Sequence, residues 1–259
     1  MTSSDPAGAR GQRSRHQFIE LLKVQTKLAL REPYGALMGI AFPAILLAVF
    51  GFIGHENPGN VGDTGLTIVD LWIPTILVIA IIAISISLPN TLVRDREIGW
   101  LRRVSTTPLH PSRLLAAQLI SDLVIAAVAV LIVMFGGALV FGASLHVQIL
   151  PFGVSLLLSI AEIFALGLVL VALTPSQTIA SAVAGVLFFV LMFLSGLWVQ
   201  PAQVGEPLRT IMYYSPSGAA ARALLDSTFS GSPSYPALVT MAIYTLIFGF
   251  VATRYFRWE

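Results

Sequence analysis

Two carboxylates, Asp122 and Glu162, stand inside long apolar stretches that contain no lysine, arginine or histidine to pair with them. A charged side chain at the centre of a lipid bilayer costs roughly 2.5–3.5 kcal/mol on insertion scales. Each group is therefore expected either to line a water-containing cavity or to carry a proton. Three roles remain open: a proton relay, contact with a bound substrate, or hydrogen bonding between helices that fixes their packing.

Three aromatic side chains, Phe188, Phe189 and Phe193, lie in another apolar stretch. They could form an apolar path for a lipophilic molecule. Aromatic residues in such stretches also face lipid or neighbouring helices, and Trp198 at the end of this stretch fits an interfacial anchor. Both interpretations stay open.

The apolar stretches that carry these groups dominate the chain. Of its 259 residues, 56% are hydrophobic and 11% are charged, and the mean hydropathy is +0.84. Soluble domains carry about 25% charged residues, so this composition excludes a water-soluble globule. A membrane-spanning helix needs roughly 20 apolar residues. The sequence predicts an all-α integral membrane protein with six transmembrane helices: Tyr34–Gly54, Ile68–Leu92, Leu114–Gly142, Leu150–Leu173, Thr178–Val199 and Pro236–Thr253.

The positions of lysine and arginine predict the orientation of the chain, because these residues accumulate on the cytoplasmic side of membrane proteins. Thirteen of the fifteen lie before the first stretch, in residues 93–113, or after the last stretch. Both termini are therefore expected in the cytoplasm. The net charge of +2 is too small for nucleic-acid binding, and the absence of cysteine excludes thiol chemistry.

The tail at residues 1–33 contains an amphipathic segment. From Phe18 to Arg31, apolar and charged side chains gather on opposite sides of a helix, which predicts an interfacial helix on the membrane surface. An ordinary surface helix of a cytosolic tail is the alternative. The chain then divides into this tail, a six-span domain at 34–253, and a short cytoplasmic tail at 254–259.

Residues 93–113 form a polar loop between the second and third stretches. Asp95–Thr106 can form a short helix in which Ile98, Trp100, Leu101 and Val104 add apolar surface. A solvated basic loop that only fixes topology is the alternative. The apolar side chains favour docking to a partner.

Residues 200–235, predicted to be the longest external connection, contain four prolines and several glycines. Val204–Tyr214 and Pro216–Leu225 can each form two or three helical turns, too short to cross a bilayer. They predict a re-entrant or cap-like helical hairpin before the last span, with an irregular loop as the alternative.

The segment from Glu97 to Leu109, EIGWLRRVSTTPL, resembles the cytoplasmic loop of ABC-2 type transporter permeases. The segment LSGLWVQP at Leu194–Pro201, followed by Tyr214-Ser-Pro216 and Arg222-Ala-Leu, resembles the same family's fifth-span end and external hairpin. Among subgroups, the chain is most similar to daunorubicin-resistance-type drug exporter permeases. The resemblance implies that Asp95–Thr106 is a coupling helix that docks on an ATPase, with these residues as its coupling set: Asp95, Glu97, Gly99, Trp100, Arg102, Arg103 and Pro108.

The resemblance also implies the partners and the activity: two ABC ATPase subunits that bind ATP and Mg²⁺, a second permease copy or a related permease, and the lipid of a bacterial plasma membrane. The expected cargo is hydrophobic or amphipathic, such as a drug, antibiotic or lipid, with a lipid-linked polysaccharide or glycolipid as the alternative. The chain is not expected to be an enzyme or to hold a cofactor, because its only lysines, Lys23 and Lys27, do not follow a glycine as a P-loop requires. A proton-coupled secondary transporter that uses Asp122 and Glu162 is the rival of another class.

Overall fold

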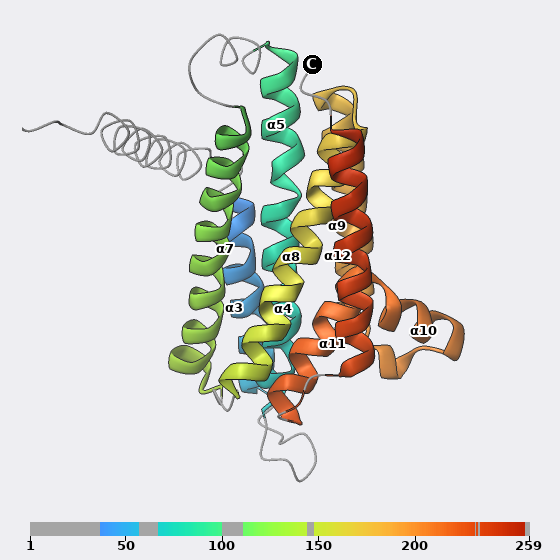
Figure 1. Cartoon of the computed structure of the whole chain (residues 1–259). Helices are drawn as coiled ribbons and strands as arrows, with labels where there is room; N and C mark the ends of the chain where they lie inside the picture. Colours follow the sequence, from blue (N-terminus) through green and yellow to red (C-terminus); the bar gives the residue numbers. More distant parts are fainter. Residues whose placement is uncertain are drawn as a thin grey trace, which may run out of the picture.

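The computed structural model describes residues 37–56, 67–99, 111–143, 148–230, 232 and 234–256. These residues form helices and no strand (Figure 1). Six candidate membrane spans confirm the expected all-α, six-span architecture. In chain order the elements are η1 (Leu37–Ala41), α3 (Phe42–Glu56), α4 (Ile68–Ser85), α5 (Ser87–Glu97), α7 (Pro111–Phe141), α8 (Ile149–Leu173), α9 (Gln177–Leu194), η3 (Pro201–Gln203), α10 (Glu206–Tyr214), α11 (Pro216–Phe229) and α12 (Tyr235–Tyr255).

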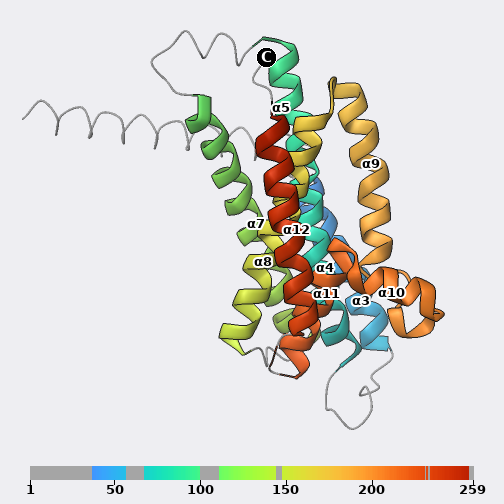
Figure 2. The ribbon, with the colours of Figure 1, turned by 45° about the vertical axis from the view of Figure 1, so that its right-hand side comes forward.

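The bundle has two distinct ends. The α5 end holds α5, the start of α9 and the end of α12, and the hairpin end holds α10 and α11 (Figure 1). Figure 2 shows α7 and α9 on opposite sides of the bundle, with α4 and α12 between them in the view. The expected interfacial helix of the N-terminal tail lies outside the described residues and stays a prediction.

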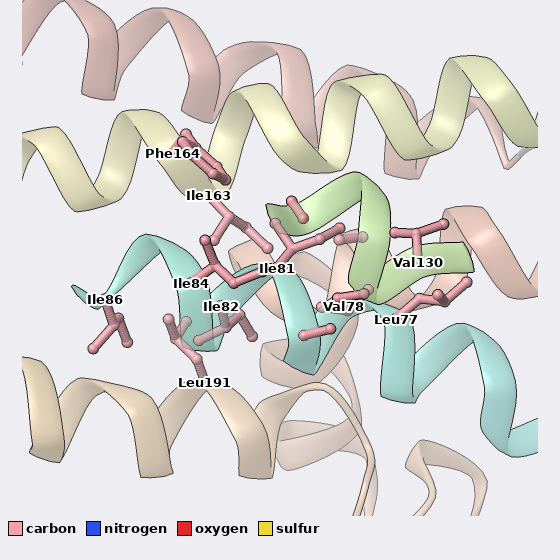
Figure 3. Packing of buried hydrophobic residues seen from close by; sticks show 14 of the residues in the cluster. Leu77, Val78, Ile81, Ile82, Ile84, Ile86, Val130, Ile163, Phe164 and Leu191 are labelled. Atoms are coloured by element: carbon pink, nitrogen blue, oxygen red, sulfur yellow. The ribbon is translucent and has the colours of Figure 1, made fainter. Parts of the chain in front are cut away.

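Helix α4 is the centre of the packing. It contacts α3, α7, α8 and α11, and 83% of the most apolar 18-residue window of its span is buried. Its side chains are apolar around the whole circumference, as expected of a helix enclosed by other helices. Figure 3 shows α4 side chains such as Ile81 and Ile82 packed among Val130, Ile163 and Leu191 of the neighbouring helices.

The start of α4 explains the acidic residue at its edge. The Asp70 carboxylate accepts hydrogen bonds from the backbone N–H and the hydroxyl of Thr67, at 2.7 and 2.8 Å. The Thr67 hydroxyl in turn accepts the N–H of Asp70, which completes a capping box. Asp70 therefore stabilises the first turn of the helix.

Several helix ends differ from the sequence prediction. The second span was expected to end at Leu92, but after a turn at Ile86 the helix continues as α5 to Glu97. Charged residues do not stop a helix once it has left the apolar layer. The fifth span ends earlier than expected, at Leu194, where Gly196 takes a positive φ of 87° that ends the helical path.

The predicted helical hairpin is confirmed as two helices, α10 and α11, joined at Ser215. Helix α11 packs against α4, α8 and α12 rather than standing apart from the bundle. Small side chains make this possible: Ser217, Gly218, Ala219, Ala220, Ala221 and Ala223 are all buried. The hydroxyls of Ser155 on α8 and Ser227 on α11 lie 2.9 Å apart and join the hairpin to the bundle.

Candidate functional site

The last turns of α5 are fastened to the connection between α8 and α9. The Glu97 carboxylate accepts the backbone N–H of Gln177 at 3.0 Å, and the Arg96 guanidinium donates to the carbonyl of Thr174. One turn further along α9 and about two turns earlier on α5, the Ser181 hydroxyl donates to the side-chain oxygen of Asn90 at 2.6 Å. We call these three contacts the α5 clamp.

The predicted coupling helix begins differently from the expectation. Asp95 and Glu97 belong to the last turn of α5, and Gly99 follows with φ of 67°, a left-handed conformation that favours glycine. No atom lies within 4 Å of the position that a Cβ would take at Gly99, so in the described chain its role is to end the helix. Ile98 beside it is 63% exposed.

Four residues of the expected coupling set lie outside the described residues: Trp100, Arg102, Arg103 and Pro108. The docking role of the whole set, including the described Asp95, Glu97 and Gly99, stays a prediction. The α5 clamp bears on this prediction, because the predicted docking residues from Trp100 onward follow Arg96 and Glu97 of the clamp directly in the sequence.

Asp122 and Glu162 lie in different surroundings. Asp122 on α7 is 3% exposed and accepts hydrogen bonds from the Gln118 amide one turn earlier, at 3.2 and 3.3 Å. Glu162 on α8 is fully buried, and within the described chain neither carboxylate oxygen has a hydrogen-bond partner. Helices α7 and α8 each pack on α4 but have few or no contacts with each other, so no observed contact joins the two carboxylates.

Glu162 continues a polar face of α8. Ser155 and Ser159 precede it at helical spacing and are fully buried, and the Ser159 hydroxyl donates to the carbonyl of Ser155. The Ser217 hydroxyl, on the adjacent α11, is the remaining buried side-chain group without a partner among the described residues. An unsatisfied buried polar group costs about 1–3 kcal/mol. Glu162 and Ser217 therefore do not contribute to stability through hydrogen bonds within the described chain, and both are candidates for a functional role.

The three phenylalanines of α9 separate into two environments. Phe188 makes an edge-to-face contact with Phe42 of α3, with ring centroids 5.7 Å apart. Phe189 and Phe193 are exposed in the single chain. An apolar path along these residues stays a prediction, while Phe188 has a packing role.

Sequence reasoning did not single out Asn90, Arg96 or Thr174. The clamp joins residues 78 to 91 positions apart. No spacing within either segment signals such a contact. The only hint was the charge of Arg96 in a loop already recognised as basic.

A family model described as ABC-2 type transporter matches residues 16–229 of this chain. Six candidate spans and a helical hairpin agree with that match over most of the chain. The chain belongs to the ABC-2 type transporter family, and it is a multi-pass membrane permease rather than a catalytic enzyme.

Two curated relatives are similar to it. "Putative transport permease YvfS" of Bacillus subtilis (strain 168) is 23% identical over 239 residues, which cover 90% of this chain and 94% of the relative. "Putative transport permease ycf38" of Cyanophora paradoxa is 28% identical over 186 residues, which cover 69% of this chain and 61% of that relative. Both names describe transport permeases.

Proposed function

We propose that this chain is the transmembrane subunit of an exporter that moves a hydrophobic or amphipathic substrate with energy from separate ATPase subunits. The α5 clamp is the observation that carries the proposal. A displacement of the loop after Gly99 would reach α4 through α5, and it would reach α8 and α9 through the hydrogen bonds of Arg96, Glu97 and Asn90. Because α4 is the packing centre, such a displacement would involve the whole subunit.

The proposed complex contains two ATPase subunits, which bind ATP and Mg²⁺, and a second permease that is identical or related. ATP-driven closure of the ATPases would tilt α3, α4 and α9 and open a path at the interface between the permeases. The contacts between α5 and α9 support a joint movement of these elements. Drugs, antibiotics and lipids are the proposed cargo, with lipid-linked polysaccharides or glycolipids as the second candidate.

The proposed location is the plasma membrane of a bacterium, with the α5 end and both termini in the cytoplasm. Arg94, Arg96 and Arg254 all lie at the α5 end, as the accumulation of basic residues on the cytoplasmic side requires. The hairpin of α10 and α11 then faces the outside.

Charge reversal at Arg102 and Arg103 tests the partnership. We expect the R102E/R103E variant to lose co-purification with its ATPase while it still inserts into the membrane, because the proposed docking surface changes the sign of its charge. The R254E/R257E variant is the control, since it reverses two charges that lie outside the proposed surface and that the sequence also predicts to be cytoplasmic. Undiminished co-purification of R102E/R103E would contradict the proposal, as would transport by the permease alone in a pH gradient.

Substitution of Arg96 tests the clamp separately from docking. We expect Arg96→Ala to lower ATP-driven transport several-fold without loss of the bound ATPase, because a charge-assisted hydrogen bond to the Thr174 carbonyl is removed, at a cost of about 1.5–3 kcal/mol. Arg254→Ala, on the exposed last turn of α12, should leave transport unchanged. Equal transport by the two variants in reconstituted vesicles would refute the role of the clamp.

A further inference from the structure

A cavity of about 290 Å³ lies at the hairpin end of the bundle, between the first turns of α4, the segment after α9 and the helices α10 and α11. Its volume is close to the lower limit of pockets that hold small molecules. The cavity lies at the opposite end of the bundle from the tip of α5 (Figure 1), and it uses none of the residues expected to dock the ATPase.

One wall of the cavity is apolar and aromatic. Leu71 and Trp72 come from the first turns of α4, and Leu225 comes from α11. Trp72 is held in place by stacking on Phe50 of α3, with ring centroids 4.3 Å apart. This wall suits the hydrocarbon or ring portion of a ligand.

The lining also carries a guanidinium group. Arg222 lies 4.6 Å from the centroid of the Tyr213 ring, and its Nε atom is 3.6 Å from a carboxylate oxygen of Asp226. A guanidinium has five N–H donors, more than one contact with Asp226 occupies. Arg222 is the one cationic residue that the described part of the chain contributes to the lining of this cavity.

Among the described residues, Asp226 is the one acidic residue of the lining, and it faces the guanidinium of Arg222. Its carboxylate forms an ion pair with Arg222, and burial raises the pKa of this carboxyl group above the ordinary value in spite of the attraction of Arg222. This ion pair involves only the Nε atom of Arg222 in the described contact, so the remaining guanidinium donors are available to a ligand. The lining therefore offers donors to a ligand more than acceptors.

We propose that this cavity binds an acidic amphiphile, with a carboxylate or phosphate head on Arg222 and an apolar body against Trp72, Leu71 and Leu225. An acidic membrane lipid and an acidic exported molecule share this chemistry. The inference does not depend on the ATPase partnership, because the cavity is formed within a single permease chain.

Photolabelling of the full-length permease in phosphatidylcholine nanodiscs tests the proposal. The probe is a palmitic acid analogue with a diazirine in its chain, and the matched probe is the corresponding alcohol. Mass spectrometry then locates the label. We expect the acid to label the segments 71–75 and 200–202 about tenfold more than the alcohol does, because a charge-assisted hydrogen bond contributes one or more factors of ten in affinity.

Three variants are expected to change labelling by the acid in different ways. Arg222→Gln should reduce labelling by the acid to the level of the alcohol. Asp226→Asn should increase labelling by the acid, because it removes the competing negative charge. Arg209→Gln is the matched control, since Arg209 pairs with Glu206 on α10 and does not line the cavity. Unchanged labelling by the alcohol in all three variants shows that the cavity is intact.

Addition of phosphatidylglycerol to the nanodiscs separates the two sources of the ligand. Competition by this lipid identifies an acidic lipid head as the occupant, and resistance to it identifies an acidic molecule that is not a bilayer lipid. Equal labelling by acid and alcohol in the unmodified protein overturns the proposal. So does a loss of labelling in Asp226→Asn, because a merely structural ion pair would be disrupted from either side.

Discussion

Replacement of Gly167 by alanine is expected to destabilise the helical bundle by about 1–3 kcal/mol or more. A Cβ at this position would overlap the hydroxyl of Ser85 and lie 2.7 Å from its carbonyl oxygen, and the backbone at Ser85 cannot move away without disturbing α4. The Ser85 hydroxyl also donates to the carbonyl of Ile163 at 2.7 Å, so the overlap threatens the hydrogen bond that joins α4 to α8.

The measurement is the thermal unfolding of the purified permease in detergent, followed by loss of the monodisperse peak in size-exclusion chromatography. Gly153→Ala is the matched control on the same helix, because in the described chain no atom beyond its own stretch of helix lies within 4 Å of the position of its Cβ. Alanine is the better helix former, so this control should be neutral or slightly stabilising. Equal unfolding temperatures of the two variants would show that α4 and α8 are not packed as closely as described.

The second large effect concerns the two buried carboxylates, for which replacement by leucine should change stability in opposite directions. Asp122→Leu leaves the Gln118 amide without the acceptor that it contacts, so we expect a loss of about 1–3 kcal/mol. Glu162→Leu removes a fully buried carboxyl group that has no partner in the described chain, so we expect a gain of similar size.

Unfolding of the isolated permease measures both variants under identical conditions. Glu162→Gln serves as the control, because it keeps the volume and polarity of the side chain and should differ little from the unmodified protein. If Glu162→Leu were as destabilising as Asp122→Leu, Glu162 would have to be a packing residue with a satisfied hydrogen bond. A stabilised variant with impaired transport would instead identify Glu162 as a group kept for function.

The sequence predicted the number and order of the spans because the length of an apolar run is a direct consequence of bilayer thickness. Helix ends were less predictable. The residues after Val93 are charged, yet they remain helical to the end of α5, because a helix does not have to stop where the chain leaves the apolar layer. Helix α11 extends to Phe229 rather than Leu225, since its last turn is supported by contacts of Ser227 with α8.

The candidate site shows a similar division. Gln118 and Asp122 are four residues apart, so a helix places their side chains side by side and the sequence alone could predict this contact. The lack of a partner for Glu162 in the described chain depends on which helices surround it, and the sequence does not show this. The α5 clamp and the Arg222 cavity unite segments far apart in the chain. Local patterns identify residue types suited to such sites, but only the packing of α4, α8, α9 and α11 brings them together.

The enclosure of α4 has a consequence for biosynthesis. Its neighbours α7, α8 and α11 are all translated after it, so on the ribosome α4 must wait in lipid before its final contacts exist. With a mean hydropathy of 2.5 over its most apolar window, it is apolar enough to be inserted alone. Its isoleucine-rich surface is thus surrounded first by lipid acyl chains, while the rest of the chain is being synthesised, and later by the neighbouring helices of the folded permease.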